Sequence, residues 1–374
     1  MKILMLSWRD PKHPLAGGAE QVMHEHAKGW IKGGHSVTLF SSRFKGSSKE
    51  EVIDGVEILR GGSQNFLGVQ IAAFFYYLKN HSKYDFLVDM FHGYPFFTPL
   101  YSKKPKLAVI QETAREVWFL NPLFWPLNWI VGMIGFITEP LVFQLYKSTQ
   151  FMTGSQSAKV DVTRMGISQE NITVVPHGVI LKKLKKKVEK EKKFTLVYLG
   201  ILSKDKGIED ALKCFSLLRK NNFQFWVIGR PETPQYSETV KRVVEDLELN
   251  GKVKFWGYVS QTKKFELLAK AHLLINPSIR EGWGLVNIEA NAVGLPVVAY
   301  NSQGLVDSVK DGESGIIIQE NTPEALAKNI TDLRESKSKY QSLVEGSVNW
   351  SQKFSWKESG RMSLQLIEKI YKQN

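Results

Sequence analysis

The sequence contains a single cysteine, Cys214, so no intramolecular disulfide can form, and this fits a reducing compartment. Its first residues, 1–8, pass directly into a strand-like run and lack the shape of a secretory signal peptide. No aspartate cluster of the DxD type is evident, and we expect neither a metal nor another cofactor. These absences favour a cytoplasmic protein.

Acidic residues are fewer than basic residues. The chain has 37 Asp and Glu against 50 Lys and Arg, which gives a net charge of +13. Such an excess suggests an anionic partner: a nucleotide, a lipid surface or nucleic acid. No nucleic-acid recognition motif accompanies the charge, so we expect no nucleic-acid partner. The 374 residues, 43% of them hydrophobic and 23% charged, indicate a globular chain long enough for two domains.

Residues 117–138 contain no charged side chain. The run is long enough to span a bilayer, but the chain on both sides belongs to one α/β domain, whose strands must pair on one side of a membrane. Two interpretations stay open: the rings pack in the core of the first domain, or they form an aromatic surface that enters the headgroup region. Nearby lysines (Lys103, Lys104, Lys106, Lys147) would favour an anionic leaflet. The candidate membrane or acceptor residues are Trp118, Phe119, Phe124, Trp125 and Trp129.

Residues 273–299 form the most informative stretch. An apolar run at 273–276 predicts a buried strand, and a polar loop follows at 277–284. Helical spacing over 285–293 ends at Gly294 and Pro296, and 297–300 is the next strand. The pattern predicts a βαβ unit, whose strand-to-helix loop is where open α/β sheets bind ligands.

Two carboxylates frame this loop. Glu281 lies within it, and Glu289 lies eight residues later on the helix. Gly282 and Gly284 flank Trp283, so that bare backbone could approach a ligand. The amides of Gly284, Leu285 and Val286 begin the helix and suit a phosphate. Amides beside hydroxyl-accepting carboxylates suit a nucleotide sugar, and the alternative is an ordinary loop with two solvated acids.

Strands and helices alternate in both halves of the chain, which predicts parallel sheets. In the first half, Gly17 and Gly18 separate the first strand from a helix over 19–31. A lysine-rich run at 182–193 has the composition of a linker. We therefore predict an acceptor-binding Rossmann-like domain at 1–185, a donor-binding Rossmann-like domain at 186–354, and a C-terminal helix within 355–374.

The E-x7-E spacing, the Gly-aromatic-Gly between the acids, and the following EANAVGLPVVA resemble the donor site of glycosyltransferase family 4. Weaker blocks, GILSKDKG at 200–207 and VVPHGV at 174–179, extend the resemblance over nearly the whole chain. It implies an α/β chain of the GT-B fold: two Rossmann-like domains facing one another across a cleft, with a C-terminal helix that crosses back to the first. It also implies a retaining enzyme that uses a nucleotide sugar, UDP- or GDP-linked, as substrate.

The resemblance assigns roles to particular residues. Glu289 would accept the ribose hydroxyls and Glu281 the sugar hydroxyls, while Lys206 and the amides from Gly282 to Leu285 would neutralise the diphosphate. The loop of Gly17 and Gly18 would face the donor. Several positions depart from the family pattern. Gln111 stands at the place of a histidine near the donor sugar and the leaving phosphate. His177 replaces an asparagine, Ile180 an aspartate and Ile201 an arginine. The candidate site residues at these departures are Gln111 and His177. Lys204 is a further candidate, because it could supply part of the charge that Ile201 lacks.

We therefore expect a retaining glycosyltransferase whose acceptor is a lipid-linked or membrane-located glycan. It would work in the cytoplasm or peripherally on the inner face of the cell membrane. The alternatives are a sugar phosphorylase or epimerase on the same scaffold, and a non-catalytic protein that binds a nucleotide sugar or a membrane.

Overall fold

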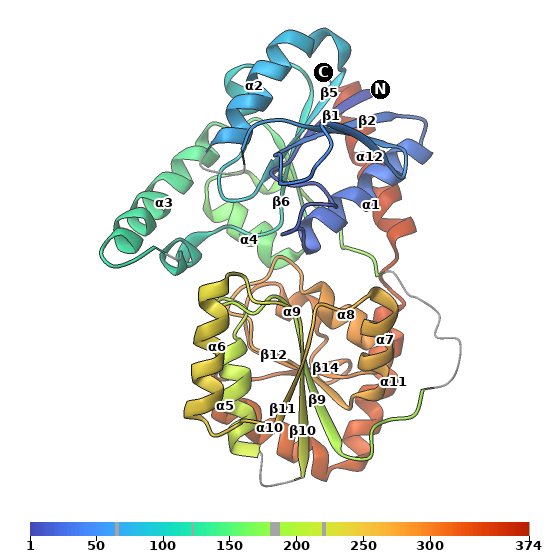
Figure 1. The fold of residues 1–374 in the computed structure, drawn as a ribbon. Coiled ribbons are helices and arrows are strands. Elements are labelled where there is room, and N and C mark those ends of the chain that lie inside the picture. The colour runs from blue at the N-terminus through green and yellow to red at the C-terminus, as the bar shows by residue number, and fades with distance from the viewer. Residues whose placement is uncertain (64–66, 122, 180–187, 219–221, 374) are drawn as a thin grey trace. The chain divides into compact units, whose positions relative to one another are not determined.

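The computed structural model describes residues 1–63, 67–121, 123–179, 188–218 and 222–373 (Figure 1). The chain forms two compact units. Unit 1 comprises Met1–Gly178 and Trp356–Asn374, and unit 2 comprises Val179–Ser355. The predicted boundary between residues 185 and 186 lies outside the described residues. The predicted C-terminal segment starts at residue 355, one residue before unit 1 resumes.

Unit 1 is organised on an eight-stranded sheet with the strand order β3-β4-β2-β1-β5-β6-β7-β8. Neighbouring strands are parallel, except that β3 runs antiparallel to β4. The antiparallel edge strand β3 did not emerge from the sequence. The strands are β1 (Lys2–Leu6), β2 (Ser36–Ser41), β3 (Glu50–Ile53), β4 (Val56–Arg60), β5 (Phe86–Phe91), β6 (Lys106–Ile110), β7 (Gln150–Thr153) and β8 (Ile172–Val174).

Helices cover both faces of this sheet, which is why its central strands are apolar on both sides. Along β1, Ile3 and Met5 face one core cluster, and Leu4 and Leu6 face another, as the two-residue period of a strand requires. The helices are α1 (Gly18–Lys32), α2 (Gly68–Asn80), α3 (Leu127–Gln144), α4 (Gln156–Arg164) and α12 (Trp356–Lys372), with short 3-10 helices η1 (His81–Lys83), η2 (Thr98–Leu100), η3 (Arg115–Leu120) and η4 (Gln169–Asn171).

The C-terminal helix α12 packs on α1 within unit 1 (Figure 1). Ser363 of α12 joins the two helices, since its Oγ lies 2.9 Å from His26 Nδ1 and accepts a 3.0 Å hydrogen bond from Trp30 Nε1. Leu366, Ile367 and other α12 residues complete the core under β1. The predicted return of the C-terminal helix to the first domain is confirmed.

Unit 2 is organised on a six-stranded parallel sheet with the order β11-β10-β9-β12-β13-β14. Its strands are β9 (Phe194–Leu199), β10 (Phe223–Ile228), β11 (Val253–Gly257), β12 (Leu273–Asn276), β13 (Val297–Ala299) and β14 (Gly315–Ile317). Its helices are α5 (Ile208–Leu218), α6 (Pro234–Asp246), α7 (Gln261–Lys270), α8 (Leu285–Asn291), α9 (Leu305–Ser308), α10 (Pro323–Glu335) and α11 (Lys337–Ser351).

Each sheet has a point where the order of its strands reverses. In unit 2 the chain runs outward from β9 to β10 and β11, then returns to place β12 on the other side of β9. In unit 1 the same reversal separates β1 from β5. Loops at the carboxyl ends of the strands diverge at such a point and leave a crevice for a ligand. The loops after β9 and β12 are therefore the expected binding loops of unit 2.

Candidate functional site

The loops after β9 and β12 contact each other directly. Ile279 N donates a 2.8 Å hydrogen bond to Asp205 O. Gly207 has a φ of +70°, and a Cβ at this position would lie only 2.1 Å from Pro277 O. Only glycine allows this approach, so the two loops form one rigid surface at the switch point.

Glu281 lies on this surface with a lysine partner. Its Oε1 is 3.2 Å from Lys206 Nζ and 3.1 Å from Ser278 Oγ. Lys206 Nζ also donates to Arg280 O at 3.1 Å and lies 3.5 Å from Asp205 Oδ2. The Glu281 and Lys206 side chains keep about a fifth of their surface exposed, at 20% and 22%. The structure thus brings two of the predicted site residues together, within reach of solvent.

Glu289 has a lysine partner of its own. It lies on α8, and its Oε1 is 2.5 Å from Nζ of Lys264 on α7. In the part of the chain that the structure describes, Oε2 of Glu289 and Oε2 of Glu281 accept no hydrogen bond. Each carboxylate therefore has one oxygen held by a lysine and one left to accept a hydroxyl. Lys264 was missed by sequence reasoning.

The predicted role of Trp283, which lies between these acids, is corrected by the structure. It was expected to touch the donor, but its side chain is 6% exposed and its ring packs edge-on against Phe354 at 5.2 Å. Gly282 and Gly284 are also buried. Gly284 has a φ of +77°, and a Cβ there would lie 2.7 Å from Ser308 Oγ. These three residues shape the loop from the inside, and half-exposed Leu285 follows them at the surface.

The departure at Ile201 is visible in the loop after β9. Its aliphatic side chain is 37% exposed, where a guanidinium would have supplied a bidentate phosphate contact. Lys204, three residues later, is exposed. Lys204 and Lys206 are the lysines of this loop. Among the described residues, no group of three or more His, Cys, Asp and Glu side chains could hold a metal ion.

Two family models match consecutive parts of this chain. Residues 16–183 match Glycosyltransferase Family 4, and residues 180–350 match Glycosyl transferases group 1. The chain belongs to glycosyltransferase family 4. It is 29% identical over 210 residues to the capsular polysaccharide biosynthesis glycosyltransferase CapM of Staphylococcus aureus. The aligned segment covers 52% of this chain and 54% of CapM. The chain thus matches about half the length of that relative.

Solved structures resemble the whole of this family 4 chain. Sucrose-phosphate synthase of Thermosynechococcus elongatus has a TM-score of 0.83 at 18% identity, with 100% of both chains covered. Anabaena Alr3699/HepE, solved in complex with UDP and glucose, has a TM-score of 0.72 at 18% identity, with 99% of this chain and 100% of HepE covered. At such identities the likeness shows the fold, and it confirms the predicted GT-B fold class.

In unit 1, Gln111 follows β6 and contacts the second departure from the family pattern. His177 Nε2 lies 2.7 Å from Gln111 Oε1. The imidazole is 3% exposed and stacks on Trp356. Burial, followed by the neighbouring His26, lowers the pKa of His177 to about 3, so the ring is neutral. His177 was expected to bind the donor. It is a buried support for Gln111 instead, because no part of a ligand could reach an imidazole enclosed in this way.

Gly17 and Gly18 lie exposed at the start of α1. The Gly17 N–H donates a 2.7 Å hydrogen bond to Glu20 Oε2. Glu20 is itself 6% exposed. A carboxylate of the same helix thus already accepts from the Gly17 amide. Gly18 has no such contact among the described residues.

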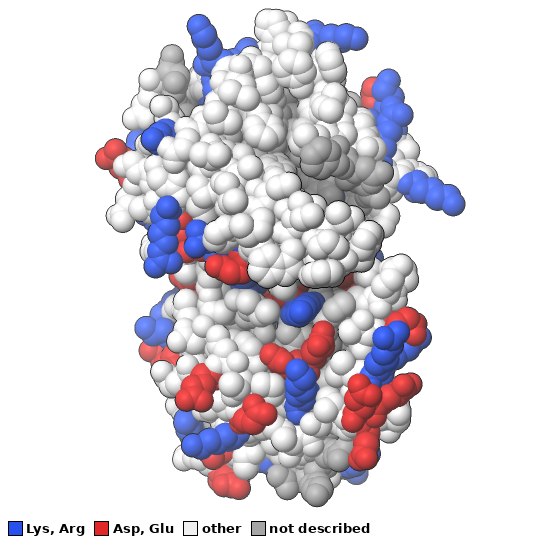
Figure 2. All heavy atoms as spheres, turned by 90° about the vertical axis from the view of Figure 1, so that its left-hand side faces the viewer, with Lys and Arg blue, Asp and Glu red and all other residues white. Residues whose placement is uncertain are grey.

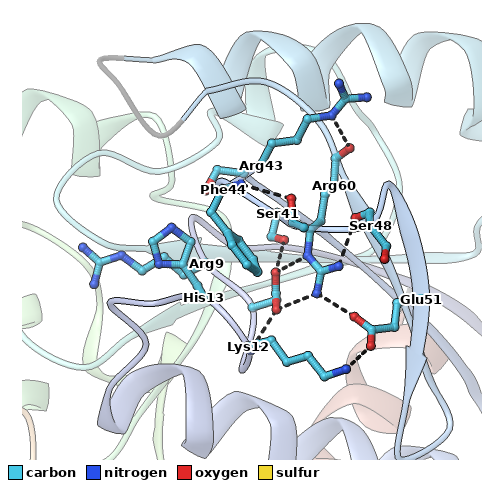
Figure 3. A network of polar contacts seen from close by, with 12 residues as sticks. Arg9, Lys12, His13, Ser41, Arg43, Phe44, Ser48, Glu51 and Arg60 are labelled. Atoms are coloured by element: carbon cyan, nitrogen blue, oxygen red, sulfur yellow. Dashed lines mark hydrogen bonds and ion pairs between the residues drawn. The ribbon is translucent and has the colours of Figure 1, made fainter.

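The loop between β1 and α1 is held by a buried ion pair (Figure 3). Arg60 donates to both oxygens of Asp10, at 2.7 Å from Nε and 2.9 Å from Nη2. Ser41 Oγ donates to Asp10 as well, and Arg60 Nη2 also contacts Glu51 at 3.1 Å. The bidentate pair fixes the start of a loop that would otherwise be free to move at the switch point of unit 1.

Acid is expected to weaken this loop attachment. Burial raises the pKa of Asp10, but the hydrogen bonds from Arg60 and from Lys12 N outweigh it and hold the pKa below its usual 3.8. A lowered pKa adds stability above the unfolded value and loses it as the pH falls through the folded value. Urea unfolding should therefore show wild-type stability falling below about pH 4. The fall should be smaller in Asp10→Asn, and an equal fall in both proteins would contradict this role.

Unit 1 also contains the uncharged aromatic segment. Trp118 and Phe119 of η3 are half-buried against the face of α3 that carries Gly132 and Gly135. Glu139, 5% exposed on the same face, accepts hydrogen bonds from Ala114 N, Arg115 N and Trp118 Nε1. This face of α3 therefore fastens η3 to unit 1.

Three other aromatic residues of the segment point outward. Phe124 is 71% exposed, Trp125 77% and Trp129 57%. Among the described residues, α3 is the one helix that is long and apolar enough to cross a membrane. The core-packing interpretation is thus wrong for these three rings and holds only for the inner face. The exposed apolar residues of α3 and the turn before it, called here the α3 surface, are Leu123, Phe124, Trp125, Leu127, Trp129, Ile130, Val131, Met133, Ile134, Ile137 and Leu141.

Proposed function

We propose that this family 4 protein is a retaining glycosyltransferase that moves a sugar from a nucleotide sugar to an acceptor located at a membrane. The observation that carries the proposal is the paired arrangement of Glu281 with Lys206 and of Glu289 with Lys264 at the switch point of unit 2. Two carboxylates, each with one open oxygen, suit the hydroxyl-rich sugar and ribose. Lys206 suits the charged diphosphate between them.

The chemistry asked of unit 2 is stabilisation of a leaving group. As the bond from the sugar to the phosphate breaks, negative charge grows on the diphosphate, and a preorganised cation there lowers the barrier. Lys206 is held by Arg280 O and Glu281, so it need not reorganise during the reaction. The family resemblance implies that the acceptor attacks from the same face as the leaving phosphate, which retains the anomeric configuration. HepE, which was solved with UDP and glucose, supports a nucleotide-linked donor by analogy.

Thermal-shift and calorimetric titration with UDP-, GDP- and ADP-sugars tests this function. A donor present at a hundredfold excess over its Kd should stabilise the folded protein by about 2.7 kcal/mol. Release of the nucleotide only in the presence of an acceptor identifies a transferase. Dependence on free phosphate would identify a phosphorylase, and conversion of the donor without an acceptor an epimerase. Binding without turnover on membranes would favour the non-catalytic alternative that the exposed Ile201 suggests.

Glu289→Ala is expected to weaken donor binding by about 1.5–3 kcal/mol, because the carboxylate would accept charge-assisted hydrogen bonds from ribose hydroxyls. Calorimetry on the folded variant measures this loss directly. Glu313→Ala is a suitable control, since Glu313 is an exposed acid on the turn before β14. Equal donor affinity in the Glu289 variant and the wild type would remove Glu289 from the site.

The location of the acceptor is proposed from the α3 surface. Helix α3 lies at the left edge of unit 1 in Figure 1 and so faces the viewer in Figure 2, where the centre of unit 1 is almost free of charged side chains. Trp125 and Trp129 are amphipathic rings of the kind that gather at the membrane interface. A single crossing by α3 is excluded, because β6 before it and β7 after it pair in one sheet. We propose that α3 lies in the plane of the interface.

Two of the four lysines that were expected to favour an anionic leaflet are engaged within unit 1. Lys104 Nζ donates to Tyr84 O, and Lys106 Nζ donates to Ser102 O at 2.9 Å. Burial lowers the pKa of Lys106 as well. Only Lys103 and Lys147 of the four are exposed. Attachment through the α3 surface should therefore depend on apolar burial more than on charge, and salt should weaken it little.

A further inference from the structure

Lys264 differs from the other lysines of its helix. Lys263 and Lys270 pair with Glu266 on the outside of α7, at 3.2 and 3.1 Å, in pairs whose side chains are 35–39% exposed. Lys264 instead reaches across to α8 and meets Glu289 at 2.5 Å, where the two side chains are 12% and 9% exposed. A pair so far removed from water gains little net stability, because desolvation of both charges offsets their attraction.

The arrangement has a more specific consequence for Glu289. Lys264 occupies Oε1, and Oε2 has no partner among the described residues. Lys264 thus fixes the carboxylate in one orientation, and Oε2 is the single oxygen left to accept a hydrogen bond. Helix α8 packs against α7, α9, α11, β12 and β13. Asp307 of α9 and Lys337, Lys339 and Glu345 of α11 form no ion pair with Glu289, and β12 and β13 carry no charged residue.

We propose that Lys264 is a positioning residue for the donor: by holding Oε1 of Glu289, it orients Oε2 to accept the vicinal hydroxyls of the nucleoside. This inference rests on the proposed function, since it takes Glu289 as the residue that meets the ribose. Lys264 needs no contact with the donor for this role. It acts through the carboxylate that it holds.

The role predicts a loss of affinity that another cation at the same place should restore. Without Lys264, nothing among the described residues holds Oε1, so the carboxylate can turn and Oε2 is no longer oriented toward the donor. An arginine at position 264 would keep a positive charge opposite Glu289 and could donate to it. Donor affinity should therefore fall in a variant without the cation and recover in a variant with a different one.

Calorimetry with UDP-glucose and GDP-mannose tests this. Lys264→Met should bind at least about tenfold more weakly than wild type. Lys264→Arg should regain most of that loss. Lys263→Met, which removes a neighbouring exposed lysine of the same helix, should behave as wild type.

Several results would overturn the inference. A Lys264→Met variant that is less stable but binds the donor with wild-type affinity has lost only a structural contact. If that variant does not fold, Lys264→Gln, which keeps a hydrogen-bond donor without the charge, takes its place with the same expected loss and the same contrary result. Absence of nucleotide-sugar binding by the wild type would instead contradict the proposed function itself.

Discussion

Lys206→Ala is expected to lower kcat by about 10²–10³-fold, the loss typical when one preorganised donor to a developing anion is removed. Its effect on KM should be much smaller, because the diphosphate gains most of its charge as the bond breaks, and an interaction that strengthens in the transition state appears in kcat. Steady-state kinetics with the donor identified by the binding screen would measure both constants.

Lys204→Ala is the matched control for this prediction. Lys204 is an exposed lysine of the same loop and, among the described residues, makes no ion pair. If Lys204→Ala has the larger effect on kcat, Lys204 and not Lys206 is the lysine that stabilises the diphosphate. It would then compensate for the family arginine that Ile201 replaces. If Lys206→Ala raises KM and leaves kcat unchanged, Lys206 serves only in binding. Thermal unfolding of each variant separates both results from a loss of the Lys206 contact with Arg280 O.

The βαβ unit around Glu281 was predictable because its signals are local. The strand at 273–276 matches β12, and the helix at 19–31 matches α1 to within one residue at each end, since both are bounded by glycine, proline or polar residues in the chain itself. The helix predicted at 285–293 ends two residues earlier as α8. Hydrophobic period and turn chemistry contain this information without reference to the rest of the fold.

The lysine that pairs with Glu289 could not be predicted from local signals. Lys264 lies 25 residues before Glu289, and its neighbours in the sequence KKFELLAK include another lysine that pairs on the surface. Only the packing of α7 against α8 selects Lys264 over Lys263. The burial of Trp283 likewise depends on Phe354, 71 residues away in sequence, so a flanking glycine pair was mistaken for an open loop.

The sequence of segment 117–138 could not decide between a protein core and a membrane surface, because hydrophobicity reports how much a side chain avoids water and not what covers it. A helix in a protein core and a helix at a membrane have the same composition. The structure separates them by position: at about 100° per residue, the exposed apolar side chains of α3 occupy roughly 200° of its circumference. A protein partner would have to wrap more than half of the helix to cover them, whereas a bilayer interface does so without a complementary shape.

Replacing Trp125 and Trp129 together with serine is expected to abolish most liposome binding and leave folding intact. Their side chains are 77% and 57% exposed, so the fold loses little apolar burial, while the membrane contact loses two large amphipathic rings. A loss of about 1.4 kcal/mol already lowers partitioning tenfold, and two rings should exceed that. Sedimentation with phosphatidylcholine vesicles, with and without phosphatidylglycerol, measures the partitioning, and thermal unfolding checks the fold.

Tyr258→Ser controls for the general loss of an exposed aromatic ring, because Tyr258 is 79% exposed in unit 2. Its vesicle binding should equal that of wild type. Raising the salt concentration should release little wild-type protein, since apolar insertion is not screened as surface charge is. Release by salt would assign the attachment to lysines instead. Failure of the wild type to sediment with either vesicle, together with a dimer that the double variant lacks, would assign the α3 surface to a second copy of the chain. In that case, activity toward a lipid-linked acceptor should be the same in both proteins once the dimer is dissociated by dilution.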